Sequence, residues 1–142
     1  MQTRRMALAS VWAAVVVVAV SCVSQSVPTP RGGRLEAVVG MPAVSAVLRG
    51  QKAGRCVLVY HSPRCGFCRD VLGSMEDVLP DLDPQAVIYT LDIDRNPDVR
   101  DAMGIGPVPV VVFLENGVEV NRWRVYRPGF LVRSGVRSFF AP

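Results

Sequence analysis

Two cysteines, three positions apart, are the residues of this chain best suited to chemistry. They begin and end the motif Cys65–Cys68, which reads Cys-Gly-Phe-Cys and follows an apolar run at 57–60. Apolar residues then recur at the spacings of one helix face, at Phe67, Val71, Met75 and Val78. The first cysteine should therefore lie at a helix N-terminus, where unpaired N–H groups and the helix dipole favour a thiolate. Because the thiolate is the reactive form, the motif predicts thiol–disulfide exchange.

The two thiols are predicted to take different parts in that reaction. Cys65 is the candidate nucleophile, which attacks a disulfide of another protein and forms a mixed disulfide. Cys68, expected to be more buried, is the candidate resolving thiol that releases the partner. We expect protein thiols and disulfides as partners, and no cofactor apart from the redox-active Cys65–Cys68 disulfide.

The same motif is also compatible with a structural disulfide or with a metal clamp. A closed zinc site needs four ligands, whereas the chain supplies one histidine, His61, and two further cysteines, Cys22 and Cys56, far from the motif's spacing. We therefore predict no metal site. Cys56 begins a predicted strand and is interpreted as a small buried hydrophobic residue, since free cysteine is among the most buried residue types.

Two neighbours of the dithiol have both a functional and a structural interpretation. His61 precedes Cys65 by four residues and could shuttle protons or, when charged, raise the thiolate population; it could equally complete the turn after the strand. Phe67 could present an apolar surface on which partners dock. The alternative is that Phe67 heads the buried stripe of the helix, in keeping with its i, i+4 relation to Val71.

The elements that must position these residues alternate between helix and strand. Helices are predicted at 42–49, 65–79, 97–104 (with Asn96 as N-cap) and 129–140. Strands are predicted at 56–61, 86–92, 110–114 and 118–125. The alternation implies parallel strands, whereas Asn116-Gly117 indicates an antiparallel hairpin. We expect an α/β fold with a mixed central sheet of about four strands flanked by helices.

The N-terminal residues have the pattern of an export signal. An arginine pair at 4–5 precedes an uncharged, mostly apolar segment at 6–20, and small residues follow just before Cys22. Three outcomes are open: cleavage near Ser21 or Ser24, retention as a membrane anchor, or lipidation of Cys22. The residues before this cysteine resemble the end of a bacterial lipobox.

Composition divides the rest of the chain and argues against one class of partner. Residues 24–34 are rich in Ser, Pro, Gly and Arg, as in a flexible spacer. We therefore expect a signal peptide or membrane anchor at 1–22, a linker at 23–37 and a folded domain at 38–142. The formal net charge is +4, of which the arginine pair supplies two. The remaining balance is nearly even, so we expect no nucleic-acid partner.

Four features from about residue 38 onward together resemble the thioredoxin superfamily. They are the strand at 57–60 before the dithiol motif, Leu91–Asp94 with Asn96-Pro97, Gly104-Ile105 with Val108–Val110, and Phe113 with Asn116-Gly117. The resemblance implies a thioredoxin fold. It also implies that Pro109 is a cis-proline, preceded by Val108, which faces the dithiol and helps to bind substrate. A proline in an apolar strand would otherwise be out of place.

The chain departs from the usual thioredoxin pattern around the dithiol. Val59 and Thr90 stand where thioredoxins typically carry a buried Asp and a Lys, so the usual proton-relay pair is missing. Arg64 replaces the tryptophan before the first cysteine, and Phe67 the proline between the cysteines. Arg64, adjacent to Cys65, could stabilise its thiolate, and Arg64 and Phe67 are both candidate substrate-binding residues.

Signal segment, spacer and dithiol together predict an exported, membrane-tethered thiol–disulfide oxidoreductase that acts on protein disulfides. Tethered thioredoxin-like proteins often serve as reductases, so we expect a monomer that reduces its targets in the bacterial periplasm or cell envelope. It would exchange electrons with a membrane donor or acceptor protein. The alternative is a non-catalytic binding module that presents the Val108–Pro109 loop and keeps its dithiol as a permanent bridge or a metal clasp.

Overall fold

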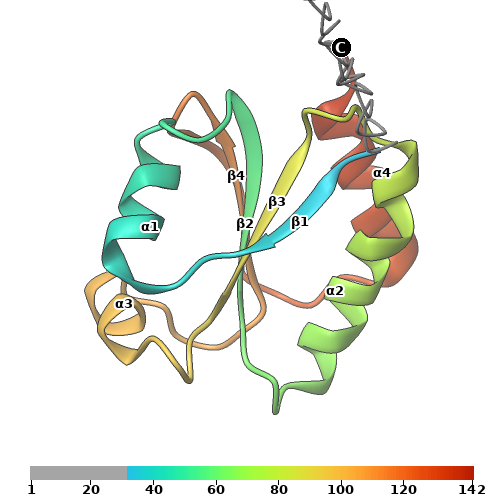
Figure 1. Cartoon of the computed structure of the whole chain (residues 1–142). Helices are drawn as coiled ribbons and strands as arrows, with labels where there is room; N and C mark the ends of the chain where they lie inside the picture. The colour runs from blue at the N-terminus through green and yellow to red at the C-terminus, as the bar shows by residue number, and fades with distance from the viewer. Residues whose placement is uncertain (1–31) are drawn as a thin grey trace, which may run out of the picture.

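The computed structural model describes residues 32–142, and these form a sheet between two layers of helices (Figure 1). The five strands lie in the order β1-β3-β2-β4-β5 and comprise β1 (Arg34–Ala37), β2 (Arg55–His61), β3 (Val87–Asp92), β4 (Val110–Glu115) and β5 (Val118–Trp123). The helices are α1 (Gly40–Leu48), α2 (Gly66–Val78), α3 (Pro97–Ala102) and α4 (Gly129–Phe140), and a short 3-10 turn, η1 (Leu79–Asp81), follows α2.

The sheet is mixed, as the alternation of elements predicted. β1 pairs with β3 and β3 with β2 in parallel, while β4 lies antiparallel to both β2 and β5. The β4–β5 turn consists of Asn116 and Gly117, with φ of 51° and 81°. Two successive positive φ angles are what a two-residue hairpin turn of the mirror-image type requires. The predicted thioredoxin-like α/β fold is confirmed.

The central strand β2 is buried on both faces. Figure 1 shows α1 and α3 against one face of the sheet and α2 and α4 against the other. Leu58 and Tyr60 pack in the core below α1 and α3, whereas Val57 and Val59 pack in the core below α2 and α4. Burial of one such side chain contributes about 1.5–3 kcal/mol. Burial on both faces accounts for the uninterrupted apolar run before the dithiol.

The sheet has five strands rather than about four, because the predicted linker at 23–37 includes β1. The backbone N–H groups of Arg34 and Val38 donate to the carbonyls of Ala86 and Thr90, at 2.9 and 2.8 Å. A four-residue edge strand shows too few alternations to be recognised beside Gly- and Pro-rich sequence. Residues 23–31 of the predicted linker and the signal segment at 1–22, which includes Cys22, lie outside the described residues. None of the helices between residues 32 and 142 has the length and apolar character needed to cross a membrane.

Asn96 has a different role from the one predicted. It precedes α3, but its side chain makes no capping bond to that helix. Instead its Oδ1 accepts the N–H of Gly40, and its Nδ2 donates to the carbonyl of Asp92, both at 2.8 Å. Asn96 thus joins the start of α1 to the turn after β3. Several element ends differ from the prediction by one or two residues: α1 begins at Gly40 rather than 42, α3 stops at Ala102 rather than 104, and β5 stops at Trp123 rather than 125.

Candidate functional site: a dithiol at the start of a helix

The sulfur of Cys65 occupies the capping position of α2. Cys65 is the N-cap residue, and its Sγ accepts the backbone N–H of Cys68 at 3.2 Å. Its own N–H donates to the carbonyl of Ser62 at 3.1 Å, which closes the loop between β2 and α2. A sulfur in this position meets the unpaired N–H groups and the positive end of the helix dipole, which stabilise negative charge.

The two thiols of the motif have unlike surroundings. Cys65 is half-buried, whereas Cys68 lies one turn into α2 and is 1% exposed. Burial, followed by the hydrogen bond with Cys65, raises the pKa of the Cys68 thiol to about 12. The second thiol is thus the more buried of the two, as the sequence predicted.

Cys56 is separate from this site. It lies near the start of β2, whereas the dithiol follows the end of that strand, and the five steps from Cys56 to His61 alone span about 17 Å of extended chain. It is buried, and burial raises its pKa to about 11. Both observations agree with the interpretation of Cys56 as a small core residue.

The loop before β4 faces the dithiol. The Val108–Pro109 peptide bond is cis, as the resemblance implied. The Cys65 thiol donates to the carbonyl of Val108, with Sγ and the oxygen 3.6 Å apart. Around the thiol is an open hollow of about 510 Å³, lined among others by Arg64, Cys65, Ile93, Asp94, Pro107 and Val108. A polypeptide bonded to Cys65 must therefore lie against this loop.

Arg64 makes its contact with a carboxylate rather than with a sulfur. Its side chain is 83% exposed, and its Nε donates to Oδ2 of Asp94 at 3.1 Å. The same oxygen accepts from the hydroxyl of Ser62 at 2.7 Å. The Arg64 bond, followed by the Ser62 bond, lowers the pKa of Asp94. Sequence reasoning assigned no role to Asp94, although its turn was among the features of the resemblance.

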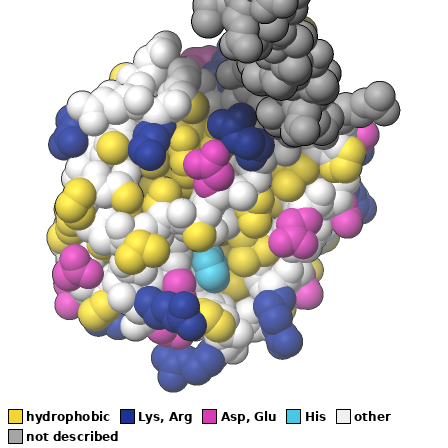
Figure 2. All heavy atoms as spheres, viewed as in Figure 1, with side chains coloured by type: hydrophobic (Ala, Val, Ile, Leu, Met, Phe, Trp, Pro, Cys, Tyr) yellow, Lys and Arg dark blue, Asp and Glu magenta, His cyan; other side chains and the backbone are white. Residues whose placement is uncertain are grey.

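His61 is not brought to the dithiol. It ends β2, where its carbonyl accepts the N–H of Ile93 at 2.9 Å. Its half-buried ring lines one hollow together with Asp92 and Arg95, whereas Cys65 lines another. Figure 2, which has the same viewpoint as Figure 1, shows the histidine in cyan. Burial lowers the pKa of His61, while nearby acidic groups oppose that shift. These contacts favour the structural interpretation of His61 as the end of the strand.

Phe67 does not head the buried stripe of α2. It is 59% exposed, and its ring stacks on Tyr126, from the loop after β5, with centroids 4.7 Å apart. Tyr126 and the adjacent Val125 are exposed as well. The aromatic pair therefore forms an apolar surface beside the cysteines. Sequence reasoning missed Tyr126, and its only signal was an aromatic residue directly after a strand.

Two paired positions of the central strands carry no ionisable group. Val59 and Thr90 are paired across β2 and β3, and both are buried. Where thioredoxins usually carry Asp and Lys, this chain therefore has an uncharged pair of buried residues.

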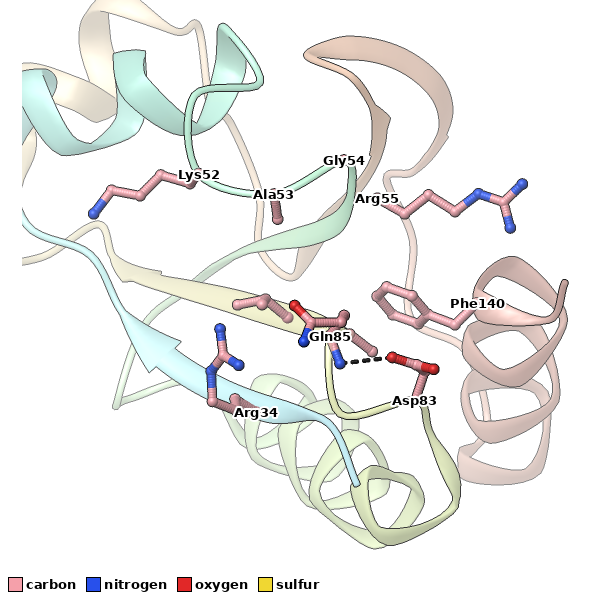
Figure 3. A pocket seen from close by; sticks show the side chains of 10 residues that line it. Arg34, Lys52, Ala53, Gly54, Arg55, Asp83, Gln85 and Phe140 are labelled. Atoms are coloured by element: carbon pink, nitrogen blue, oxygen red, sulfur yellow. Dashed lines mark hydrogen bonds between the residues drawn. The ribbon is translucent and has the colours of Figure 1, made fainter. Parts of the chain in front are cut away.

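A second hollow, of about 320 Å³, lies at the opposite end of the sheet (Figure 3). Its lining includes residues at the starts of the three parallel strands, and the ring of Phe140 from α4 is turned toward it. Two of its three cations are paired, Arg34 with Glu36 at 3.0 Å and Arg55 with Glu115 at 2.5 Å. This hollow is remote from the Cys65–Cys68 dithiol and lies at the end of β2 that carries Cys56. Among residues 32–142 there is no group of three or more His, Cys, Asp or Glu side chains that could hold a metal ion.

A mixed sheet, a Cys-x-x-Cys motif at a helix start and a cis Val108–Pro109 bond whose carbonyl side faces the first cysteine together define a dithiol protein of thioredoxin fold. The thioredoxin family model matches residues 44–132, more than half of the chain, so this chain belongs to the thioredoxin family. Membership supports thiol–disulfide oxidoreductase chemistry.

Relatives by sequence are thioredoxins of bacteria. The chain is 30% identical to the thioredoxin of Rickettsia bellii over 53 residues, which are 37% of this chain and 50% of that protein. It is 27% identical to the thioredoxin of Chlamydia muridarum over 70 residues, 49% of this chain and 68% of that one. The matches thus span about half to two thirds of these relatives' length.

Solved thioredoxin structures share the fold. A mutant thioredoxin from Halobacterium salinarum superposes with a TM-score of 0.63 at 17% identity, over 77% of this chain and 93% of that one. The thioredoxin of Malassezia sympodialis gives 0.62 at 22% identity, over 79% and 95%. At such identities the likeness concerns the fold alone.

Proposed function

We propose that this protein is a thiol–disulfide oxidoreductase that reduces protein disulfides outside the cytoplasm through Cys65 and Cys68. The proposal rests on two thiols of one helix turn in opposite environments, the first at the edge of an open hollow and the second buried. Membership in the thioredoxin family supports the class of reaction.

The reaction has two exchanges. The Cys65 thiolate attacks one sulfur of a partner disulfide, whose other sulfur leaves as a thiolate and takes a proton from solvent. The Cys68 thiol then loses its proton to solvent and attacks Sγ of Cys65. A Cys65–Cys68 disulfide forms, and the second partner sulfur leaves. Two electrons pass to the partner, and a dithiol donor protein must return them by the reverse exchange.

Groups on both sides of Cys65 are suited to hold the partner. The Val108 carbonyl lies on one side, with Arg64 at the rim of the same hollow. Pro109 is buried and does not line the hollow, so its part is to form the cis bond that follows Val108. Phe67 supplies an apolar surface on the helix side. The partner we infer is an extended polypeptide segment that carries the target cysteine and packs apolar side chains beside it.

The direction in which the chain enters the domain supports a tether. β1 and β2 are both parallel to β3 and therefore point in the same direction. The dithiol follows the C-terminal end of β2, opposite the end of the sheet at which β1 begins. In Figure 1 the chain enters β1 near the top, while the loop from β2 to α2 lies at the bottom. A membrane anchor or a lipid on Cys22 would leave the dithiol facing away from the membrane. We propose such a tethered monomer in the bacterial periplasm or cell envelope, served by a membrane electron-donor or acceptor protein.

Reduction of insulin by the full-length chain, followed as turbidity with dithiothreitol as donor, tests the reaction. We expect Cys65→Ser to abolish catalysis and Cys68→Ser to trap mixed disulfides, while Cys56→Ser retains activity. Activity that survives both single changes in the motif would remove the dithiol from the mechanism. A wild-type protein that binds partners while its dithiol stays inert would be the binding module instead.

The mass of the native N-terminus tests the tether. An acyl mass on Cys22 would demonstrate lipidation, and a free N-terminus near Ser24 would demonstrate cleavage without a lipid.

A further inference from the structure

One carboxylate holds the loop that leads into the dithiol. Oδ2 of Asp94 accepts from the hydroxyl of Ser62 at 2.7 Å and from Nε of Arg64 at 3.1 Å. The Ser62 hydroxyl in turn accepts the backbone N–H of Arg64 at 3.2 Å. The Ser62 carbonyl accepts the N–H of Cys65 at 3.1 Å. The loop is therefore fixed to Asp94 by two side chains, within three residues of the nucleophile.

Hydrogen bonds of the backbone fix the position of Asp94 itself. Its N–H donates to Oδ1 of Asp92 at 2.9 Å, and the N–H of the preceding Ile93 donates to the carbonyl of His61, also at 2.9 Å. The carboxylate and Cys65 line the same hollow. A negative charge thus has a fixed place in the lining of the hollow that contains Cys65, whereas the buried positions Val59 and Thr90 are neutral.

We propose that Asp94 is a positioning residue that sets the reduction potential of the dithiol. Its carboxylate orients the loop before Cys65, and its negative charge, partly neutralised by Arg64, opposes the build-up of further negative charge in the hollow that Cys65 lines. The proposal rests on the proposed redox function. It adds that Asp94 tunes the reduction potential, in a chain that has Val59 where thioredoxins usually have a buried aspartate.

The charges around the dithiol give the direction of the effect. Burial is the largest cause of the raised pKa of Cys68, and the charge of Asp94 acts in the same direction. Other charged groups close to Asp94 are Arg64 on the loop and Arg100 on α3, and the charge of Asp94 also reaches His61 at the end of β2. Because the Cys68 thiol stays protonated at pH 7, the effect at that pH must act on the sulfur of Cys65, which lines the same hollow as Asp94. Removing the carboxylate should favour negative charge on that sulfur, which stabilises the reduced form and makes the potential less negative.

Two substitutions separate a charge effect from a purely structural one. Asp94→Asn keeps an oxygen that can accept from Ser62 but removes the negative charge. Arg64→Gln removes the neutralising positive charge and leaves the carboxylate. If the charge sets the potential, the two changes move it in opposite directions, and the double variant returns toward the wild type. If the bonds serve only to hold the loop, both changes disturb it in the same way.

The measurement is the equilibrium of the full-length chain with glutathione or dithiothreitol redox buffers at pH 7, read as the fraction of oxidised dithiol. If a substitution changes the pKa of the ionised thiol by one unit, the equilibrium constant for exchange with the buffer changes by at most about tenfold. This corresponds to about 30 mV in the reduction potential. We expect Asp94→Asn to shift the constant toward the dithiol by about three- to tenfold, and Arg64→Gln about two- to fivefold the other way. Asp98→Asn, an equal charge change at an exposed position of α3, is the matched control and should leave the constant unchanged.

Shifts of Asp94→Asn and Arg64→Gln in the same direction, or no larger than that of Asp98→Asn, would overturn the proposal while leaving the redox function intact. A wild-type dithiol that never equilibrates with either buffer would overturn both. Because Arg64 is exposed, its variant should fold and give a result even if Asp94→Asn does not.

Discussion

Asn96→Ala is expected to destabilise the domain by about 2–4 kcal/mol, because it removes a clamp between two loops. Asn96 is 4% exposed and makes two bonds of 2.8 Å, one to the N–H of Gly40 and one to the carbonyl of Asp92. Each buried group left without its partner costs about 1–3 kcal/mol. Two groups give about 2–6 kcal/mol, and the lower part of that range applies because both bonds are only partly buried.

Asn96→Asp distinguishes this clamp from a helix cap. Asp and Asn serve about equally well as N-caps, so a residue that merely capped α3 would tolerate the change. In the clamp, one carboxylate oxygen still accepts from Gly40, but the other faces the carbonyl of Asp92 and can no longer donate. We therefore expect Asn96→Asp to lose about 1–3 kcal/mol as well.

The assay is urea-induced unfolding of the full-length chain, followed by the fluorescence of the buried Trp123. Asn121→Ala, at an exposed position of β5, is the control and should change stability by about 0.5 kcal/mol at most. Wild-type stability of Asn96→Asp, together with a loss of about 1 kcal/mol or less in Asn96→Ala, would refute the clamp and restore the predicted cap.

Three further predictions concern the site. Phe67→Ala should lower kcat/KM for a protein disulfide by roughly two- to tenfold, since an aromatic contact is worth about 0.5–1.5 kcal/mol, whereas Val118→Ala, at an exposed position away from the dithiol, should not; equal effects of the two would contradict the docking role. Among the cysteines of residues 32–142, only the first of the motif should react with iodoacetamide at pH 8 in the reduced native protein. Burial raises the pKa of Cys56 to about 11 and of Cys68 to about 12, and mass mapping that finds either labelled first would contradict this. Burial lowers the pKa of His61 below its ordinary 6.5, so the folded state prefers the neutral ring, and this contribution to stability is lost as pH falls through about 6.5 and below. Between pH 7.5 and 5.5, the urea midpoint of unfolding should fall less in His61→Gln than in the wild type. An equal fall in both proteins would exclude His61 as a source of the pH dependence.

Strong local signals made most of the fold predictable from the sequence. A continuous apolar run predicted β2 because burial on both faces leaves no polar alternation. Asn116-Gly117 predicted the hairpin because both residues tolerate positive φ. β1 escaped prediction because an edge strand of four residues depends on pairing with β3, which no local pattern encodes.

The surroundings of the dithiol were less predictable, because they come from side chains far apart in sequence. Asp94 reaches Ser62 across 32 positions, and Tyr126 meets Phe67 from the loop after β5. Adjacency to Cys65 suggested that Arg64 would act on the thiolate, yet a carboxylate from the turn after β3 takes its Nε. Spacing therefore located the reactive sulfurs, whereas tertiary contacts decide which groups tune them.

The contrast between the two thiols is a consequence of helix geometry. Three positions along an α-helix amount to about 4.5 Å of rise and leave the two side chains on nearly the same face. The two sulfurs therefore differ in their place along the axis, one at the exposed cap and the other within the buried first turn. The buried stripe of α2 includes Cys68, Val71, Met75 and Val78, so the resolving thiol itself heads the stripe. Phe67, about 100° around the helix from that thiol, must then point outward, as its stacking on Tyr126 shows. The same spacing that buries one sulfur thus exposes the aromatic ring beside the other.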